Sequence, residues 1–151
     1  MRRGPNEAGY KAGAIIYRTK IDVSALGADP THNSASWENI GSFGTTLAID
    51  YTPPVDAIAW VNLQADCRND TAGQRFAIAS YDVNTAVYIS RMDAHAPAAN
   101  YRIPMNALGY LDLTADVELQ LRGRIYVYGG IVTVDKTATM THLDLLVFKQ
   151  P

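Results

Sequence analysis

Apolar and polar residues alternate with a period of two along most of the chain, as in a β-strand with one buried face. Between residues 114 and 123, Val117, Leu119 and Leu121 fall on one face, and the residues between them are charged or polar. No stretch long enough for an ordinary helix has apolar side chains at the spacing of an amphipathic helix. The pattern therefore predicts an all-β protein.

The same alternation, interrupted by turn-forming residues, predicts strands along the whole chain. About nine or ten strands are expected, mostly about 8 to 14 residues apart, without crossover helices between them, which is typical of an antiparallel β-sandwich or barrel. They are drawn from eleven candidate segments, some of them short or weak, at residues 15–23, 36–40, 45–51, 56–66, 74–81, 85–91, 101–110, 114–123, 124–128, 131–135 and 139–149.

Glycine and proline residues set the expected boundaries of these strands. The pair Pro53-Pro54 ends the strand at 45–51, and Gly123 is expected to separate two strands. Gly129-Gly130 has the composition of a two-residue hairpin turn. Pro104 and Gly109 make the segment 101–110 a weak or edge strand.

Two of the strands differ in how their faces are expected to be used. In the strand at 56–66, Trp60 is assigned to the core. The final strand is apolar on both faces, because Leu146 and Phe148 lie opposite the regular apolar set. These two side chains require a cover, which is either a loop of the same chain, such as its N-terminal arm, or another subunit.

Length and composition agree with one ordinary domain. The chain has 151 residues and a mass of 16.5 kDa, with 48% hydrophobic and 19% charged residues, which excludes global disorder. Residues 1–13, rich in glycine, are expected to form a flexible N-terminal arm, and residues 14–151 one β-sandwich domain. The basic pair Arg2-Arg3 is not followed by an apolar stretch, so we expect no signal peptide and no membrane segment, and synthesis in a cytoplasm.

Charge and cysteine content exclude several classes of function. The net charge is -2, so the whole-chain basic character of a nucleic-acid binder is missing. The single cysteine, Cys67, excludes an internal disulfide framework and is expected to be an unreactive, partly buried thiol.

Candidate catalytic chemistry is sparse. His32, His95 and His142 lie far apart in the sequence, and none has a second histidine or a cysteine at metal-ligand spacing. The segment Asp66 to Thr71 is rich in oxygen ligands of the kind that Ca²⁺ prefers, but its spacing departs from known calcium loops and a plain loop is the preferred interpretation. We therefore expect a protein that is not an enzyme and that uses no cofactor or metal.

Several segments carry a resemblance to a known class of proteins. The chain resembles the jelly-roll domains of the C1q/TNF-like type and the small trimeric jelly-roll proteins on tailed-phage virions. The segments that carry it are Trp37-Glu38-Asn39-Ile40, Ile49-Asp50-Tyr51-Thr52-Pro53-Pro54, Gln74-Arg75-Phe76-Ala77-Ile78, Val117-Glu118-Leu119-Gln120-Leu121-Arg122 and Thr141-His142-Leu143-Asp144-Leu145-Leu146-Val147-Phe148. The chain has no collagen-like stalk and no cysteine pair, which favours the phage proteins over the animal ones.

The resemblance implies an antiparallel β-sandwich of the jelly-roll type and a homotrimer on a virion. It implies a capsid decoration (cement) protein, with the major capsid protein or another virion protein as partner and no contact with nucleic acid or membrane. Leu146 and Phe148 are then candidates for the subunit interface. The candidate capsid-anchoring residues of the arm are Arg2, Arg3, Tyr10 and Lys11.

Two other functions stay open from the sequence. A receptor-binding domain at a fibre tip, recognising host carbohydrate or protein, would use loop residues; the candidates are Trp37, Asp66, Asn69, Asp70 and His95. An enzyme on a jelly-roll scaffold would need clustered metal ligands, which the scattered histidines do not provide.

Overall fold

The computed structural model describes residues 9–42 and 44–151. This part of the chain contains thirteen strands and no helix. The strands are β1 (Ile15–Asp22), β2 (Thr31–His32), β3 (Glu38–Asn39), β4 (Gly41–Ser42), β5 (Thr45–Thr46), β6 (Ala48–Tyr51), β7 (Ala57–Asn69), β8 (Arg75–Asp82), β9 (Val87–His95), β10 (Arg102–Leu113), β11 (Leu119–Val127), β12 (Val132–Val134) and β13 (His142–Lys149). Among the described residues, no helix is long and apolar enough to cross a membrane.

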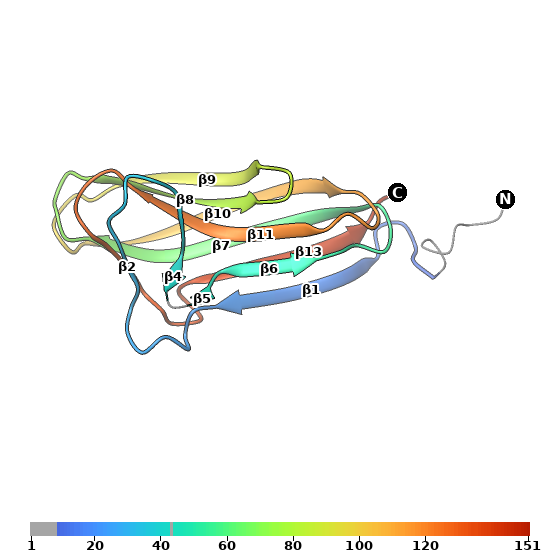
Figure 1. Ribbon diagram of the computed structural model, residues 1–151, viewed down its shortest axis with the longest axis horizontal. Helices are drawn as coiled ribbons and strands as arrows, with labels where there is room; N and C mark the ends of the chain where they lie inside the picture. Colours follow the sequence, from blue (N-terminus) through green and yellow to red (C-terminus); the bar gives the residue numbers. More distant parts are fainter. Residues whose placement is uncertain (1–8, 43) are drawn as a thin grey trace.

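Eight of these strands form two antiparallel sheets packed face to face (Figure 1). The first sheet has the order β1-β13-β7-β10, and the second has the order β6-β11-β8-β9. If these eight strands are counted along the chain, the orders become 1-8-3-6 and 2-7-4-5, which is the connectivity of a jelly roll. The predicted fold class, an antiparallel jelly-roll β-sandwich, is confirmed by this strand order.

The core lies between the two sheets and is supplied by every second residue of their strands. In β7 the inward residues Ala59, Val61 and Leu63 are fully buried, on the face opposite Trp60. Gly123 falls at an inward position of β11, where an added Cβ would lie 3.0 Å from side-chain atoms of both Leu47 and Leu63. The glycine therefore fills a core position where a larger residue has no room, and the prediction that it separates two strands is wrong.

Both long edges of the sandwich are partly closed. At one edge Gly109 of β10 approaches β9 so closely that a Cβ would lie 2.4 Å from the carbonyl oxygen of Ile89. At the other edge the rings of Tyr17 and Tyr51 stack with centroids 4.1 Å apart and bridge β1 and β6. These contacts shield edges that would otherwise expose unpaired backbone groups.

Three further expectations about the strands need correction. The pair Gly129-Gly130 is not a hairpin turn, because β11 and β12 do not pair with each other; the segment carries the chain from one sheet to the other. The segment 101–110 is not a weak strand: β10 pairs with β7 over its whole length, although it does lie at a sheet edge. Val117 is not on a strand, and 44% of it is exposed.

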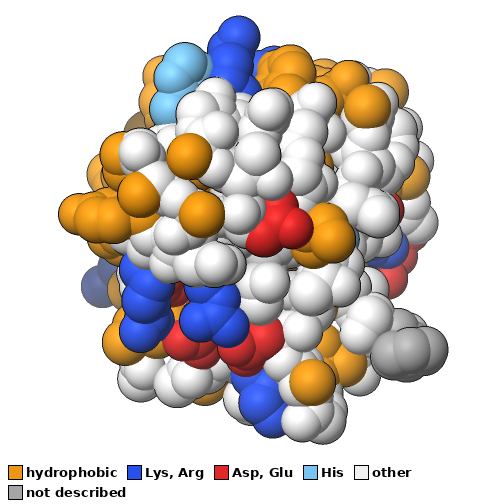
Figure 2. All heavy atoms as spheres, turned by 90° about the vertical axis from the view of Figure 1, so that its left-hand side faces the viewer, with side chains coloured by type: hydrophobic (Ala, Val, Ile, Leu, Met, Phe, Trp, Pro, Cys, Tyr) orange, Lys and Arg blue, Asp and Glu red, His pale blue; other side chains and the backbone are white. Residues whose placement is uncertain are grey.

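The two ends of the sandwich differ. The start of β1 and the end of β13 are paired with each other, through Ile15 and Phe148, at one end (Figure 1). The turns that follow β7, β9 and β11 lie at the opposite end, which faces the viewer in Figure 2.

Candidate functional site

The outer face of the first sheet carries a continuous group of apolar side chains that no part of the described chain covers. We call this group the apolar face. Its residues are Ile15, Ile58, Trp60, Leu108, Tyr110, Leu146 and Phe148.

The pairing register places these residues in adjacent rows across all four strands. In the central row Leu146, Trp60 and Tyr110 lie side by side on β13, β7 and β10. In the next row Ile15, Phe148 and Ile58 are neighbours, and Leu108 lies on the other side of the central row. The ring of Phe148 meets the ring of Trp60 edge-on, with centroids 6.3 Å apart.

The side chains of the apolar face are unusually open to solvent for their size. Tyr110 is 73% exposed, Leu108 62%, Ile15 61% and Trp60 51%. With strands about 4.8 Å apart and rows about 6.8 Å apart, the seven apolar positions cover about 230 Å² of sheet, and charged or polar residues hold the other positions of these rows. Exposed apolar patches of a few hundred Å² with a polar rim are typical of interaction sites.

Polar groups lie on one side of the apolar face. A hollow of about 290 Å³ lies between Trp60 and Leu108 and is also lined by Arg18, Asn62 and Asp144. The side-chain oxygen of Asn62 is buried there and accepts no hydrogen bond from the described residues. A buried acceptor without a donor costs about 1–3 kcal/mol.

The structure tests whether a loop of the same chain covers Leu146 and Phe148. Both side chains lie half-buried on the outer face, as predicted, and no loop of the described chain covers them. The assignment of Trp60 to the core is wrong, because Trp60 lies on the same outer face, opposite Val61 and Leu63. The polar residues Asn62 and Gln64 on the same face were the signal in the sequence.

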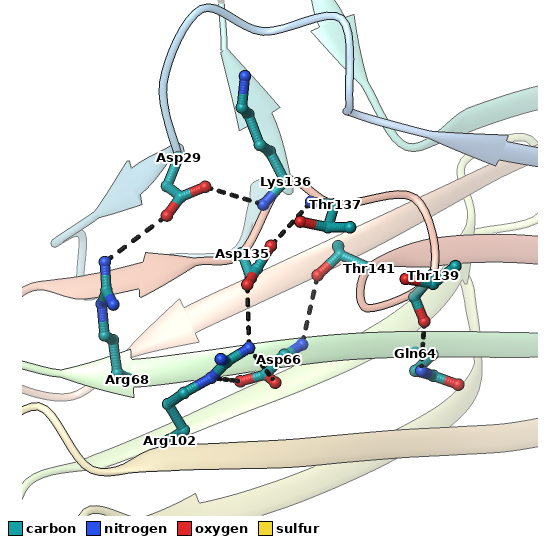
Figure 3. Close-up of polar contacts among 10 residues, drawn as sticks. All are labelled: Asp29, Gln64, Asp66, Arg68, Arg102, Asp135, Lys136, Thr137, Thr139 and Thr141. Atoms are coloured by element: carbon teal, nitrogen blue, oxygen red, sulfur yellow. Dashed lines mark hydrogen bonds and ion pairs between the residues drawn. The ribbon is translucent and has the colours of Figure 1, made fainter.

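At the turn end of the sandwich, basic and acidic side chains lie against one another (Figure 2). Arg102 bridges Asp66 and Asp135, at 2.8 Å and 2.9 Å, and Arg68 lies 3.6 Å from Asp29 (Figure 3). The cavity that Arg102 shares with the two aspartates has about 10 Å³, which is room for about one water molecule.

This ion-pair network has a structural role. Asp29 accepts a hydrogen bond from the backbone of Lys136, so the loop after β1 is tied to the loop after β12 (Figure 3). Hydrogen bonds from Thr137 lower the pKa of Asp135, with a smaller contribution from the charge of Arg102. Asp66 is thus engaged in the middle of this network on β7, and not placed in a loop as expected.

The other residues of the expected recognition loop also have structural partners. Asn69 is fully buried at the end of β7, where its amide donates to the carbonyl of Gly129 and its oxygen accepts from the backbone of Thr71. Asp70 accepts a hydrogen bond from the backbone of Ile131. Within residues 9–42 and 44–151, no three His, Cys, Asp or Glu side chains converge in a way that could hold a metal ion.

The histidines and the cysteine lie apart from one another. His32 is buried beside Glu38, and burial lowers its pKa despite that carboxylate. The Nε2 atom of His142 lies 3.2 Å from a carboxylate oxygen of Asp144 on β13. Cys67 is fully buried, and burial strongly raises the pKa of its thiol, which makes the thiol unreactive at neutral pH.

The remaining predicted site residues lie in three places. Trp37 precedes β3 and packs against the outer face of the second sheet, between Tyr88 and Tyr126. His95 is the last residue of β9 and is exposed. Tyr10 and Lys11 precede β1 and are exposed, whereas Arg2 and Arg3 lie outside the described residues.

Sequence comparison finds neither a matching family model nor a matching curated protein. Solved structures with a similar fold are a carbohydrate-binding module (CBM6) of lichenase 5A from Cellvibrio mixtus in complex with cellotriose, and Eiger TNF from S. frugiperda. The first is 9% identical, with a TM-score of 0.40, covering 87% of this chain and 88% of that chain. The second is 10% identical, with a TM-score of 0.45, and the match covers 93% of this chain and 90% of that chain.

The infectious bursal disease virus VP2 subviral particle is a third similar structure. It is 8% identical, with a TM-score of 0.29, and the match covers 89% of this chain and 35% of that chain. Scores at this level carry no functional argument, and the assignment of the fold rests on the strand order described above.

Proposed function

We propose that copies of this chain associate through the apolar face into a homotrimer, and that the trimer is a non-catalytic decoration protein on the capsid of a tailed phage. The observation that carries the proposal is the apolar face itself, seven side chains in register on one sheet. The virion and the decoration role rest on the resemblance of the sequence to small trimeric jelly-roll virion proteins.

The charges around the apolar face suit an interface between copies. Arg18 and Lys20 lie exposed at the β1 edge of the sheet, and Asp112 lies exposed at the β10 edge. When two copies meet through this face, a basic edge of one can lie beside an acidic edge of the other. Stable interfaces bury about 800 Å² per partner, so these polar edges would be included together with the apolar centre.

A trimer of this kind would stabilise a capsid by mass action. A protein that binds only the assembled shell shifts the equilibrium toward that shell, with no catalytic step. The exposed residues Tyr10 and Lys11, together with Arg2 and Arg3, are the proposed contacts with the capsid lattice.

The mass of the purified protein in solution tests the association. Light scattering after size exclusion should give three times the chain mass of 16.5 kDa. A monomer at all accessible concentrations would refute the homotrimer.

The number of copies per virion tests the role. Decoration requires hundreds of copies on each particle, whereas a receptor-binding tip requires only a few. A low copy number would assign the chain to the receptor-binding alternative. Deletion of residues 1–12 should abolish capsid binding, and unchanged binding would refute the anchoring role of the arm.

A further inference from the structure

The outer face of the second sheet, on the opposite side of the molecule from the apolar face, carries aromatic rings and guanidinium groups in mutual contact. We call it the aromatic–arginine face. Its residues are Trp37, Arg75, Tyr81, Tyr88, Arg91, Asp93, Arg124, Tyr126 and Tyr128.

Two alanines of β8 form the floor of this face. Ala77 and Ala79 point away from the core, and yet neither is exposed. The ring of Trp37 lies 5.3 Å from the ring of Tyr88 on β9 and 5.6 Å from that of Tyr126 on β11. Since β9 and β11 flank β8, Trp37 spans the two alanines, and their small size makes room for it.

Arg124 is the residue on this face whose positive charge is not balanced. Its guanidinium carbon lies 4.7 Å from the ring centre of Tyr81, and one terminal nitrogen is 3.4 Å from the carbonyl oxygen of Trp37. The buried Nε–H donates no hydrogen bond, and the guanidinium has no ion pair with any carboxylate of the described residues. Because no described carboxylate balances this charge, an anionic group of a ligand at the terminal nitrogens of Arg124 would be stabilising.

The charge of the neighbouring Arg91 is in contrast balanced by a carboxylate. It donates two hydrogen bonds of 2.9 Å to the carboxylate of Asp93 and a third to the hydroxyl of Tyr128, and it also lies over the ring of Trp37. The pair presents donors and acceptors side by side in a fixed geometry. Such a pair suits a ligand with hydroxyl groups, which both donate and accept.

The face as a whole is basic on an acidic chain. Arg75, Arg91 and Arg124 face a single carboxylate, Asp93, whereas the net charge of the whole chain is -2. The face also offers two aromatic rings to solvent, because Tyr88 is 45% exposed and Tyr128 is 44% exposed. Rings open to solvent beside an unbalanced cation favour a ligand that has both an apolar ring face and a negative charge.

We propose that the aromatic–arginine face binds an acidic oligosaccharide. The C–H faces of its sugar rings stack on Tyr88 and Tyr128, its hydroxyl groups bind the pair of Arg91 and Asp93, and a carboxylate of the sugar pairs with Arg124. A nucleic acid fits less well, because Asp93 neutralises part of the row of cations that a phosphate backbone requires.

This inference is independent of the proposed homotrimer, because the two faces lie on opposite sheets. A trimer built through the apolar face leaves the aromatic–arginine face free. Failure of sugar binding therefore leaves the proposed assembly standing, and the reverse also holds.

Titration calorimetry with the purified protein tests the proposal. The acidic probes are trigalacturonate and 3′-sialyllactose, the neutral control is maltotriose, and an oligouridylate 12-mer tests the nucleic-acid alternative. At least one acidic probe should bind at least tenfold more tightly than maltotriose, and the binding should weaken in high salt. Failure of both acidic probes to bind, equal binding of maltotriose, or tighter binding of the oligouridylate would overturn the proposal.

Variants locate the binding. Arg124→Gln should weaken binding of the acidic probe at least tenfold, and Tyr88→Leu should weaken it as well. Arg68→Gln, an exposed arginine on β7 of the opposite sheet and outside both faces, is the matched control and should bind like the wild type. If Arg124→Gln does not fold, Tyr88→Leu decides, since Tyr88 is exposed and its loss does not open the core. Unchanged affinity in the folded variants would overturn the proposal.

Discussion

Replacing Tyr110 by alanine should dissociate the proposed trimer and leave the subunit folded. Tyr110 is 73% exposed, so its ring contributes little to the folded subunit beyond its place opposite Trp60 on the next strand. Such a cross-strand pair contributes at most about 1 kcal/mol to the free energy of unfolding. The change in subunit stability should therefore be no larger than this.

The effect on association should be much larger. A tyrosine buries about 150–250 Å² when it is enclosed, and the exposed 73% of Tyr110 is the share that an interface could still bury. At about 25 cal/mol per Å², this gives about 3 kcal/mol for each copy of the ring. Each interface should therefore dissociate about 100-fold more readily.

Sedimentation over a range of concentrations measures the association, and urea unfolding of the dissociated subunit measures its stability. Tyr101→Ala is the matched control: the same substitution at a residue that is 57% exposed but outside the apolar face. The reasoning fails if Tyr110→Ala keeps the wild-type mass at every concentration, or if Tyr101→Ala dissociates to the same extent.

Three further predictions concern the scaffold. Gly123→Val should lower the free energy of unfolding by about 1–3 kcal/mol in urea titrations, because the new side chain meets two leucines of the core; an unchanged midpoint would contradict the packing described. The pKa of Asp135 is lowered by hydrogen bonds from Thr137, so its contribution to stability is present above the unfolded value near 3.8 and is lost as the pH falls through the lower folded value. Acid unfolding should therefore be less steep in Asp135→Asn below pH 3.8, and identical acid profiles would refute this role. Cys67 should react with a thiol reagent only after unfolding, and rapid labelling of the native protein would show that the residue is not buried.

The fold class could be predicted because alternation with a period of two survives in the individual strands. The inward residues Leu143, Leu145 and Val147 of β13 were recognisable from the sequence, and so was the outward position of Leu146 and Phe148. The order of the strands in each sheet was not recognisable from the sequence, because local patterns do not say which strands pair. Gly129-Gly130 illustrates this limit, because a hairpin turn and a crossing between sheets call for the same flexible residues.

The candidate sites were harder to predict than the fold. Trp60 was assigned to the core from its hydrophobicity, although the polar Asn62 on the same face indicated the outside. Leu108 and Tyr110 lie in a segment whose proline and glycine masked a regular strand. The aromatic–arginine face joins residues from four separate segments, so no single stretch of sequence contains its pattern.

The pairing of the first long strand with the last has a consequence for biosynthesis. Because β13 lies between β1 and β7, the first sheet lacks one of its central strands until β13 has left the ribosome. The nascent chain must therefore hold β1 without its antiparallel partner while the strands between β1 and β13 are made. Contacts of such long sequence separation also slow folding after release. During that interval the exposed strand edges are open to other chains, so production at low temperature or with a holding chaperone should raise the yield of native protein.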